Sequence, residues 1–195
     1  MEIRLLHGAA IAPYIDDLAR LRLTLFREFP YLLDSSLSYQ ADYLANYAES
    51  GRSLVVLALD GNQLVGAATG LPLVDVDLEL QQPFLAQGRD PASVYYFGES
   101  VLLPAYRGQG LGVRFFIERE SYAHKLAEFD YCTFCAVERP SGHPLRPADY
   151  KPLHGFWRNR GFLQDPSLRT VIVGAIWTSR KAAKIMSFWL KALPI

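Results

Sequence analysis

The sequence contains little cysteine. Cys132 and Cys135 are the two cysteines among 195 residues, and two thiols cannot build a disulfide framework. Their C-x-x-C spacing is found in redox and zinc sites, but a second pair of ligands is missing. Both lie in the apolar stretch 131–137, which is typical of a buried strand. We therefore expect structural, buried thiols rather than a metal or redox site, and we expect no metal cofactor.

Long hydrophobic runs and an excess of charge of one sign are also missing. No run of about 18 apolar residues occurs, so we expect no membrane span, and the N-terminus lacks the apolar core of a signal peptide. Lysine plus arginine and aspartate plus glutamate number 20 each, which gives no basic surface for nucleic acid or a membrane. These absences predict a cytoplasmic protein whose partners include neither nucleic acid nor membrane.

Apolar and aromatic residues are abundant by contrast. Half of the residues are hydrophobic and 13% are aromatic, a composition that argues against disorder. A chain of 195 residues is long enough for one domain with a substantial core. We see no linker or internal repeat and expect a single domain over residues 1–195.

The most informative stretch is 99–126, ESVLLPAYRGQGLGVRFFIERESYAHKL. Residues 95–103 are apolar, aromatic and β-branched, which predicts a strand, and Pro104 ends its ladder. A glycine-rich turn then opens a helix with one apolar face, to which we assign the following residues: Leu111, Phe115, Phe116, Tyr122, Ala123 and Leu126. Most of the other face is charged: Arg114, Glu118, Arg119 and Lys125.

This turn is suited to binding an anion. The first N–H groups of a helix lack intrahelical partners and lie at the positive end of its dipole, and glycine lets an anion approach the backbone closely. A phosphate-binding P-loop would need Lys and Ser/Thr after the last glycine, where Val113 and Arg114 stand. The dinucleotide fingerprint would need glycine at position 113. A pyrophosphate therefore fits the turn, although both of these motifs are excluded.

The remaining pattern, Q/R-x-x-G-x-G/A, is Arg107-Gly108-Gln109-Gly110-Leu111-Gly112, preceded by V-L-L-P-A-Y. It resembles the acyl-CoA-binding motif of the GNAT superfamily of N-acetyltransferases. The later W-R-N-R-G-F at 157–162 resembles the family's Y-x-x-x-G-F. The resemblance spans nearly the whole chain, though only 101–112 is specific. It implies an α/β (α+β) fold: a mixed, twisted, mostly antiparallel sheet of about six to seven strands with about four to five helices.

The rest of the chain supplies the other elements of such a fold. We expect strands over 3–6, 53–59, 64–69, 131–137, 169–177 and 185–190, with a turn at 60–62 and a hairpin connection at 178–184. Helices are expected over 13–29, 38–49 and 150–160, and a shorter one over 76–87. The segment 70–94 is either an insertion near the acceptor site or a plain surface loop.

The resemblance implies that acyl-CoA lies between two splayed central strands. Aligned on Arg107, the backbone N–H that binds the thioester carbonyl belongs to Leu102. The pyrophosphate would bind the turn, with Arg107 adding charge. The predicted acetyl-CoA site therefore consists of these residues: Leu102, Arg107, Gly108, Gln109, Gly110, Leu111, Gly112 and Val113.

Glu99 is the predicted general base, acting directly or through water. A primary amine is mostly protonated at neutral pH and must lose a proton before it attacks, and an acid within an apolar strand is often adapted to such a task. The alternatives are that Glu99 pairs with a neighbouring Arg or Lys, or contacts the amine only electrostatically. Ser100 faces the other way by strand alternation.

The general acid is less clear, because Trp157 occupies the position of the family's usual tyrosine and Tyr150 that of a frequent asparagine. Indole cannot donate a proton as an acid. Tyr150 is the predicted donor, with His154 as a weaker candidate, and the thiolate could also leave unassisted. His143 lies in a proline-rich loop that could touch substrate. Several aromatic residues could line an acceptor pocket or belong to the core: Tyr31, Tyr39, Tyr43, Tyr47 and Trp157.

These features predict an N-acetyltransferase that moves an acetyl group from acetyl-CoA to a primary amine by direct attack in a ternary complex. The acceptor would be a small molecule or a peptide. The alternative is a regulatory domain that binds CoA or acyl-CoA with little or no acyl transfer. A site for a longer acyl chain and a homodimer, formed through the tyrosine-rich N-terminal helices or the last strand, also remain open.

Overall fold

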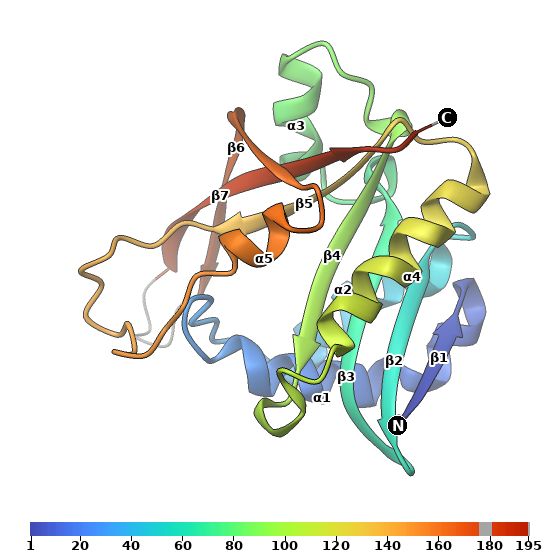
Figure 1. Ribbon diagram of the computed structural model, residues 1–195, viewed down its shortest axis with the longest axis vertical. Helices are drawn as coiled ribbons and strands as arrows, with labels where there is room; N and C mark the ends of the chain where they lie inside the picture. The colour runs from blue at the N-terminus through green and yellow to red at the C-terminus, as the bar shows by residue number, and fades with distance from the viewer. Residues whose placement is uncertain (176–180, 195) are drawn as a thin grey trace.

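The computed structural model describes residues 1–175 and 181–194. Within them, one sheet has the strand order β1-β2-β3-β4-β5-β7-β6 (Figure 1). Every neighbouring pair is antiparallel except β4 and β5, which run parallel. The strands are β1 (Glu2–Leu6), β2 (Leu54–Asp60), β3 (Gln63–Pro72), β4 (Val94–Leu102), β5 (Tyr131–Val137), β6 (Leu163–Ala175) and β7 (Lys181–Ala192).

Helices cover both faces of the sheet. The α-helices are α1 (Ile15–Phe26), α2 (Leu37–Glu49), α3 (Leu78–Ala86), α4 (Leu111–Leu126) and α5 (His154–Arg158), joined by 3₁₀ turns at Gly8–Tyr14, Leu73–Asp75, Pro91–Ser93 and Pro104–Tyr106. The first three helices pack on one face, and α4 and α5 pack on the other. This arrangement confirms the predicted fold class, with seven strands and five α-helices among the described residues.

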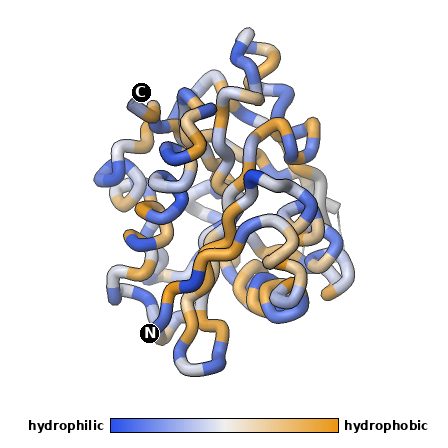
Figure 2. Tube along the Cα trace, turned by 90° about the vertical axis from the view of Figure 1, so that its right-hand side faces the viewer, coloured by the Kyte–Doolittle hydropathy of each residue, from blue (hydrophilic) through white to orange (hydrophobic). Residues whose placement is uncertain are grey.

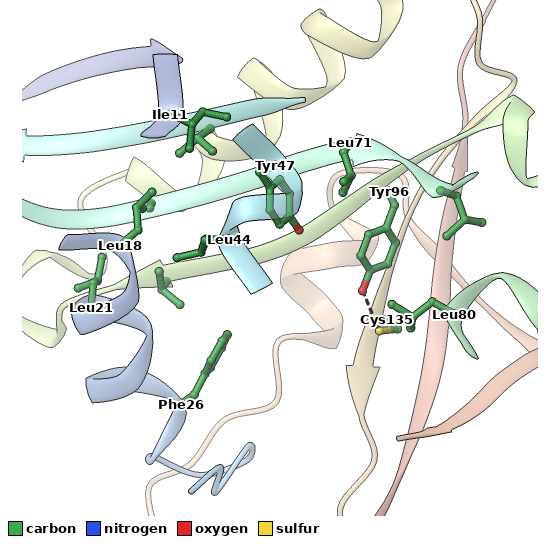
Figure 3. Packing of buried hydrophobic residues seen from close by; sticks show 14 of the residues in the cluster. Ile11, Leu18, Leu21, Phe26, Leu44, Tyr47, Leu71, Leu80, Tyr96 and Cys135 are labelled. Atoms are coloured by element: carbon green, nitrogen blue, oxygen red, sulfur yellow. Dashed lines mark hydrogen bonds between the residues drawn. The ribbon is translucent and has the colours of Figure 1, made fainter. Parts of the chain in front are cut away.

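Two aromatic-rich cores follow from this layering. The face that carries α1, α2 and α3 buries Leu44, Tyr47 and Tyr96, which Figure 3 shows converging on the strands, and the Tyr96 hydroxyl lies 3.1 Å from Cys135 Sγ. The face under α4 buries Phe97 and Trp189. Along the helices hydrophobic and hydrophilic residues alternate (Figure 2), as expected when one stripe of each helix is buried.

Both cysteines are buried and free, as predicted. Burial raises the pKa of both thiols, that of Cys135 to about 11, while the hydrogen bond with Tyr96 acts in the opposite direction. Thiols of this kind are mostly protonated at neutral pH and unreactive. Among the described residues no group of three or more His, Cys, Asp or Glu side chains is arranged to hold a metal ion. No helix in that part of the chain is long and apolar enough to cross a bilayer.

Several predicted boundaries were wrong. The helix predicted over 13–29 is a 3₁₀ turn followed by α1, which ends at Phe26. The helix predicted over 150–160 is only His154–Arg158, since 138–153 is a loop that contains several prolines. The last two strands are longer than predicted: β6 begins at Leu163 and shifts register between Asp165 and Arg169, around Pro166, and β7 begins at Lys181. Residues 176–180, which include the end of the predicted strand 169–177 and the start of the predicted connection 178–184, lie outside the described residues.

Candidate active site

The two parallel strands separate after a short pairing. The β4–β5 ladder contains only Val94 with Tyr131, Tyr95 with Cys132, and Tyr96 with Thr133. Beyond Tyr96, β4 continues to Leu102 and β5 to Val137 along different directions (Figure 1). The backbone of both strands is therefore unpaired on the sides that face this opening. The opening is the splayed pair that the family resemblance implies.

A β-bulge lies in β4 just beside the opening. Ala68 pairs with Ser100 and Gly70 with Phe97, so two residues, Gly98 and Glu99, stand opposite Thr69 alone. The N–H of Glu99 donates to the Thr69 hydroxyl at 3.2 Å. Gly98 is required here, because a Cβ atom would lie 2.0 Å from the Tyr47 hydroxyl. The bulge turns the Glu99 side chain toward α1 and α2.

Arg119 of α4 holds the bulge from the opposite face. Its guanidinium donates to the backbone carbonyls of Thr69 and Glu99, both at 3.2 Å, and to the Ser100 hydroxyl at 2.7 Å. The side chain is 1% exposed and stacks over Phe97 at 4.2 Å. Burial lowers the pKa of Arg119 to about 10. Arg119, which the sequence analysis placed with the charged residues opposite the apolar face of this helix, is therefore buried against the sheet.

The backbone of Leu102 faces the opening. Leu103 N donates to Val65 O of β3 at 2.9 Å, and antiparallel pairing alternates from residue to residue. The N–H and C=O of Leu102 are therefore directed away from β3. The carbonyl accepts a hydrogen bond from Arg107 Nε at 3.0 Å. The amide that the resemblance assigns to the thioester carbonyl thus lies at the edge of the opening.

The turn at 107–112 presents backbone N–H groups without partners. Gly108 and Gly110 have φ values of +77° and +85°, which only glycine adopts without strain. Gly110 caps α4 without any side-chain hydrogen bond. The backbone hydrogen bond that begins the helix runs from Arg114 N to Gly110 O at 3.0 Å. Glycine at position 112 avoids a close contact, because a Cβ atom there would lie 3.3 Å from the Phe156 ring. The turn offers an anion site made of backbone.

The side chain of Arg107 is already engaged. Besides its bond to Leu102 O, it forms an ion pair with Glu28, just after α1, with Nη2 and Oε2 3.1 Å apart. Both side chains are about half exposed. Arg107 would have to exchange Glu28 for a phosphate in order to add charge to the turn, as the sequence predicts.

Glu99 is buried and paired. Its carboxylate forms an ion pair with Arg22 of α1, and the two side chains are 4% and 7% exposed respectively. Burial lowers the pKa of Arg22 and the Glu99 carboxylate raises it, with a net rise. The Nε atom of Arg22 also donates to the buried Gln40 side chain at 2.7 Å. The pairing of Glu99 with a neighbouring arginine was one of the alternatives left open by the sequence.

Two tyrosines of α2 connect this ion pair to the bulge. The Tyr43 hydroxyl lies 3.0 Å from that of Tyr47 and 3.4 Å from Glu99 Oε2, and the latter distance is long for an O–H···O bond. Burial raises the pKa of both phenols. The Tyr43 ring also stacks under the Arg22 guanidinium at 4.2 Å. Glu99 therefore keeps one oxygen that no close donor occupies.

The predicted acid, Tyr150, lies in the loop after β5 rather than in a helix. Its ring packs edge-on against Phe29, with centroids 4.7 Å apart. Burial raises the pKa of Tyr150, and Arg146, stacked over the ring at 5.0 Å, lowers it. Tyr31 interacts electrostatically with both Glu99 and Tyr150. The fold thus brings the predicted base and acid near the same tyrosine, Tyr31.

Other predicted residues lie apart from this group. Trp157 packs in the second core, with ring centroids 5.0 Å from Phe134 and 4.9 Å from Trp189, and His154 stacks in the same cluster. Tyr39 is 58% exposed. His143 is the exception, because its ring lies 5.5 Å from Phe29, the ring against which Tyr150 also packs.

Arg22 was missed by the sequence analysis, although a signal existed. It follows Leu18 by four residues and precedes Leu25 by three, so helical spacing places it on the buried stripe of α1. Arg119 lies four residues from both Phe115 and Ala123, so helical spacing likewise places it on the buried stripe of α4. An arginine within an apolar stripe must find partners inside the protein.

No protein-family model and no curated protein matches this sequence. Solved structures do. It is similar to ribosomal-protein-alanine N-acetyltransferase from Brucella melitensis (17% identity, TM-score 0.60, 99% of this chain and 100% of that one). It is also similar to a GNAT-family acetyltransferase from Streptococcus pneumoniae (13% identity, TM-score 0.61, 99% of this chain and 100% of that one). A third similar structure is an aminoglycoside 6'-N-acetyltransferase complexed with coenzyme A (15% identity, TM-score 0.61, 100% of this chain and 98% of that one). The architecture is therefore that of the GNAT acetyltransferases.

Proposed function

We propose that this chain, which has the GNAT fold, is an acetyl-CoA-dependent N-acetyltransferase acting on a primary amine by direct attack in a ternary complex. One observation carries the proposal. The splayed strands leave the Leu102 backbone facing an opening, and the same chain continues from there into a turn of unpartnered N–H groups. The opening fits a thioester, and the turn fits a pyrophosphate.

Each part of the chain then has a role. The N–H groups from Gly108 to Val113 hold the pyrophosphate, and the glycines leave room for it. The Leu102 N–H donates to the thioester carbonyl and stabilises the charge that develops there. Acetyl-CoA supplies the activated acyl group. Arg119 and Thr69 keep the bulge, and therefore this strand edge, in position.

The acceptor amine enters from the side of α1 and α2. Glu99 accepts its proton through Oε2, directly or through water, while the ion pair with Arg22 holds the carboxylate in place. Tyr150 donates to the departing thiolate. A raised pKa keeps its proton in place at neutral pH. Donation requires the loop 138–153 to bring Tyr150 toward the opening, or the thiolate to leave unassisted.

Calorimetric titration with acetyl-CoA, with free CoA as the control, tests the first half of the proposal. We expect binding in the micromolar range, and release of free thiol only when an amine is added. Absence of binding to both ligands in a folded protein would contradict the proposal.

Replacement of Glu99 by Gln tests the base. We expect the rate at neutral pH to fall by roughly a hundredfold or more, with acetyl-CoA affinity within about twofold of the wild type. Because the substitution also breaks a buried ion pair, folding must be verified by circular dichroism. An unchanged rate across the pH range would remove Glu99 from this role.

The second candidate function is a regulatory domain that binds CoA without acyl transfer. The packing of Trp157 into the second core favours it, since no hydroxyl stands at that position. Tight CoA binding combined with no thiol release for amines of varied size and charge would support this alternative.

A further inference from the structure

A lysine is buried on the acceptor side without a counterion. Lys184 of β7 is 6% exposed, and it shares a sheet face with Met186 and Phe188 of the core. Among the described residues its side chain forms no hydrogen bond or ion pair. The segment 173–182 contains no Asp or Glu. A buried ammonium group of this kind is costly unless something neutralises it.

A second cation lies beside it. Arg139 follows the end of β5, where Glu138 N donates to Ile185 O at 2.8 Å and so places Arg139 next to Lys184 across the ladder. Among the described residues, its guanidinium donates to two backbone carbonyls, those of Pro30 at 2.8 Å and Tyr31 at 3.1 Å. Burial, together with the smaller effect of the nearby Arg139 charge, lowers the pKa of Lys184 to about 8. Burial also lowers the pKa of Arg139.

The nearest carboxylate in sequence is occupied elsewhere. Glu138 forms a bidentate pair with Arg169 of β6, at 2.8 Å to both oxygens. The two cations therefore face each other without an acid. Structural arginines and lysines in protein interiors are normally paired, and two adjacent, partly desolvated cations are the arrangement expected of a site for an anion.

The pair lies on the same side of the sheet as Glu99. Arg139 holds the carbonyl of Tyr31, whose phenol interacts electrostatically with Glu99. Along β5, Arg139 comes four residues after Cys135, which contacts Tyr96 of β4.

We infer that Lys184 and Arg139 form a subsite for an anionic group of the acceptor, a carboxylate or a phosphate, on the same side of the sheet as Glu99. This inference rests on the proposed acetyl transfer and narrows its substrates to amines that carry a distant negative charge.

Matched peptides test the inference. Binding of tri-alanine and of tri-alanine amide to the CoA-saturated protein is measured by calorimetry. A second pair, Ala-Ala-phosphoserine amide and Ala-Ala-Ser amide, distinguishes phosphate from carboxylate. We expect at least one anionic probe to bind about tenfold or more tightly than its neutral partner, as loss of a charged contact usually costs.

Two variants locate the effect. Lys184→Met should remove most of the preference for the anionic probe, leave the neutral probe unchanged, and melt no lower than the wild type, because no partner is lost. Lys125→Met makes the same change at an exposed position of α4 and should behave as the wild type. A merely structural lysine would lower the melting temperature and leave the preference intact.

The inference and the proposed function fail in different ways. Equal affinity for both members of each pair, a preference that survives Lys184→Met, or no binding of any probe would overturn the inference. Loss of the proposed function would instead appear as no acetyl-CoA binding, or as anionic binding without thiol release. A preference for the anion without thiol release would leave the subsite standing.

Discussion

The turn at 107–112 and the buried cluster around Glu99 are the two parts of the proposed site, and they are built in different ways. The turn is built from backbone: Gly108 and Gly110 adopt left-handed conformations, and nothing lies within 4 Å of where their Cβ atoms would be. The buried cluster is built from side chains of distant segments: Arg22 from α1, Gln40 and Tyr43 from α2, and Glu99 from β4. A single substitution at a glycine of the turn should therefore abolish binding. The effect of a substitution in the side-chain cluster depends on whether the partner of that side chain is also replaced.

The largest effect is expected at the turn. Gly110→Glu places a charge and a side chain on the pyrophosphate site and strains a left-handed position, so acetyl-CoA affinity should fall roughly a thousandfold, or about 4 kcal/mol. Calorimetry on the folded variant measures it. Gly88→Glu is the matched control, because Gly88 also has a positive φ, of +67°, and open space around it. Wild-type affinity in Gly110→Glu would show that the turn binds no pyrophosphate.

Substitution of a charged residue in the buried cluster around Glu99 should lower the free energy of unfolding. Arg22→Met leaves the Glu99 carboxylate buried without its partner, which typically costs about 3 kcal/mol in the free energy of unfolding. Urea denaturation measures it. The double variant Arg22→Met with Glu99→Leu should recover most of that loss, because no buried charge remains, yet show no acetyl transfer. Additive losses in the double variant would mean that the two side chains do not act as a pair.

Replacement of Lys184 should change the free energy of unfolding in the opposite direction from replacement of Arg22. Its pKa is lowered to about 8 from 10.5, so protonation is disfavoured in the folded state. Lys184→Met should therefore raise the free energy of unfolding at pH 7 by about 2 kcal/mol. The gain should be full below about pH 8 and shrink as the pH rises toward 10.5, where the unfolded lysine also loses its proton. Arg139 is the charged group that faces Lys184. A variant less stable than the wild type at pH 7 would argue against an uncompensated charge.

The smallest effect is expected where the two regions meet. Glu28→Gln frees Arg107 from a half-exposed ion pair, and such pairs contribute little. Acetyl-CoA affinity should rise roughly twofold at low salt, with the difference vanishing at high salt, because exposed charges are screened. A fall in affinity would show that Glu28 orients Arg107 rather than competing for it.

The two regions also differ in how far the sequence predicted them. The strand, the proline, the glycines and the following helix are consecutive, so local conformational rules sufficed for the turn and for α4. The splayed strands and the Leu102 assignment came only from the family resemblance. Helix ends were missed where local signals conflicted: Pro13 lies inside a 3₁₀ turn rather than at the start of α1, and the loop at 138–153 continues past Tyr150.

The sequence by itself determined the order of elements, the amphipathic helices and the glycine turn, because each depends on residues that are neighbours along the chain. Tertiary structure alone decided that Glu99 is paired with Arg22, that Arg119 holds the bulge, and that Lys184 meets Arg139. A side chain's partner depends on which segments the sheet brings together, and on a bulge that turns one residue to the other face. No pattern of spacing within a single segment carries that information.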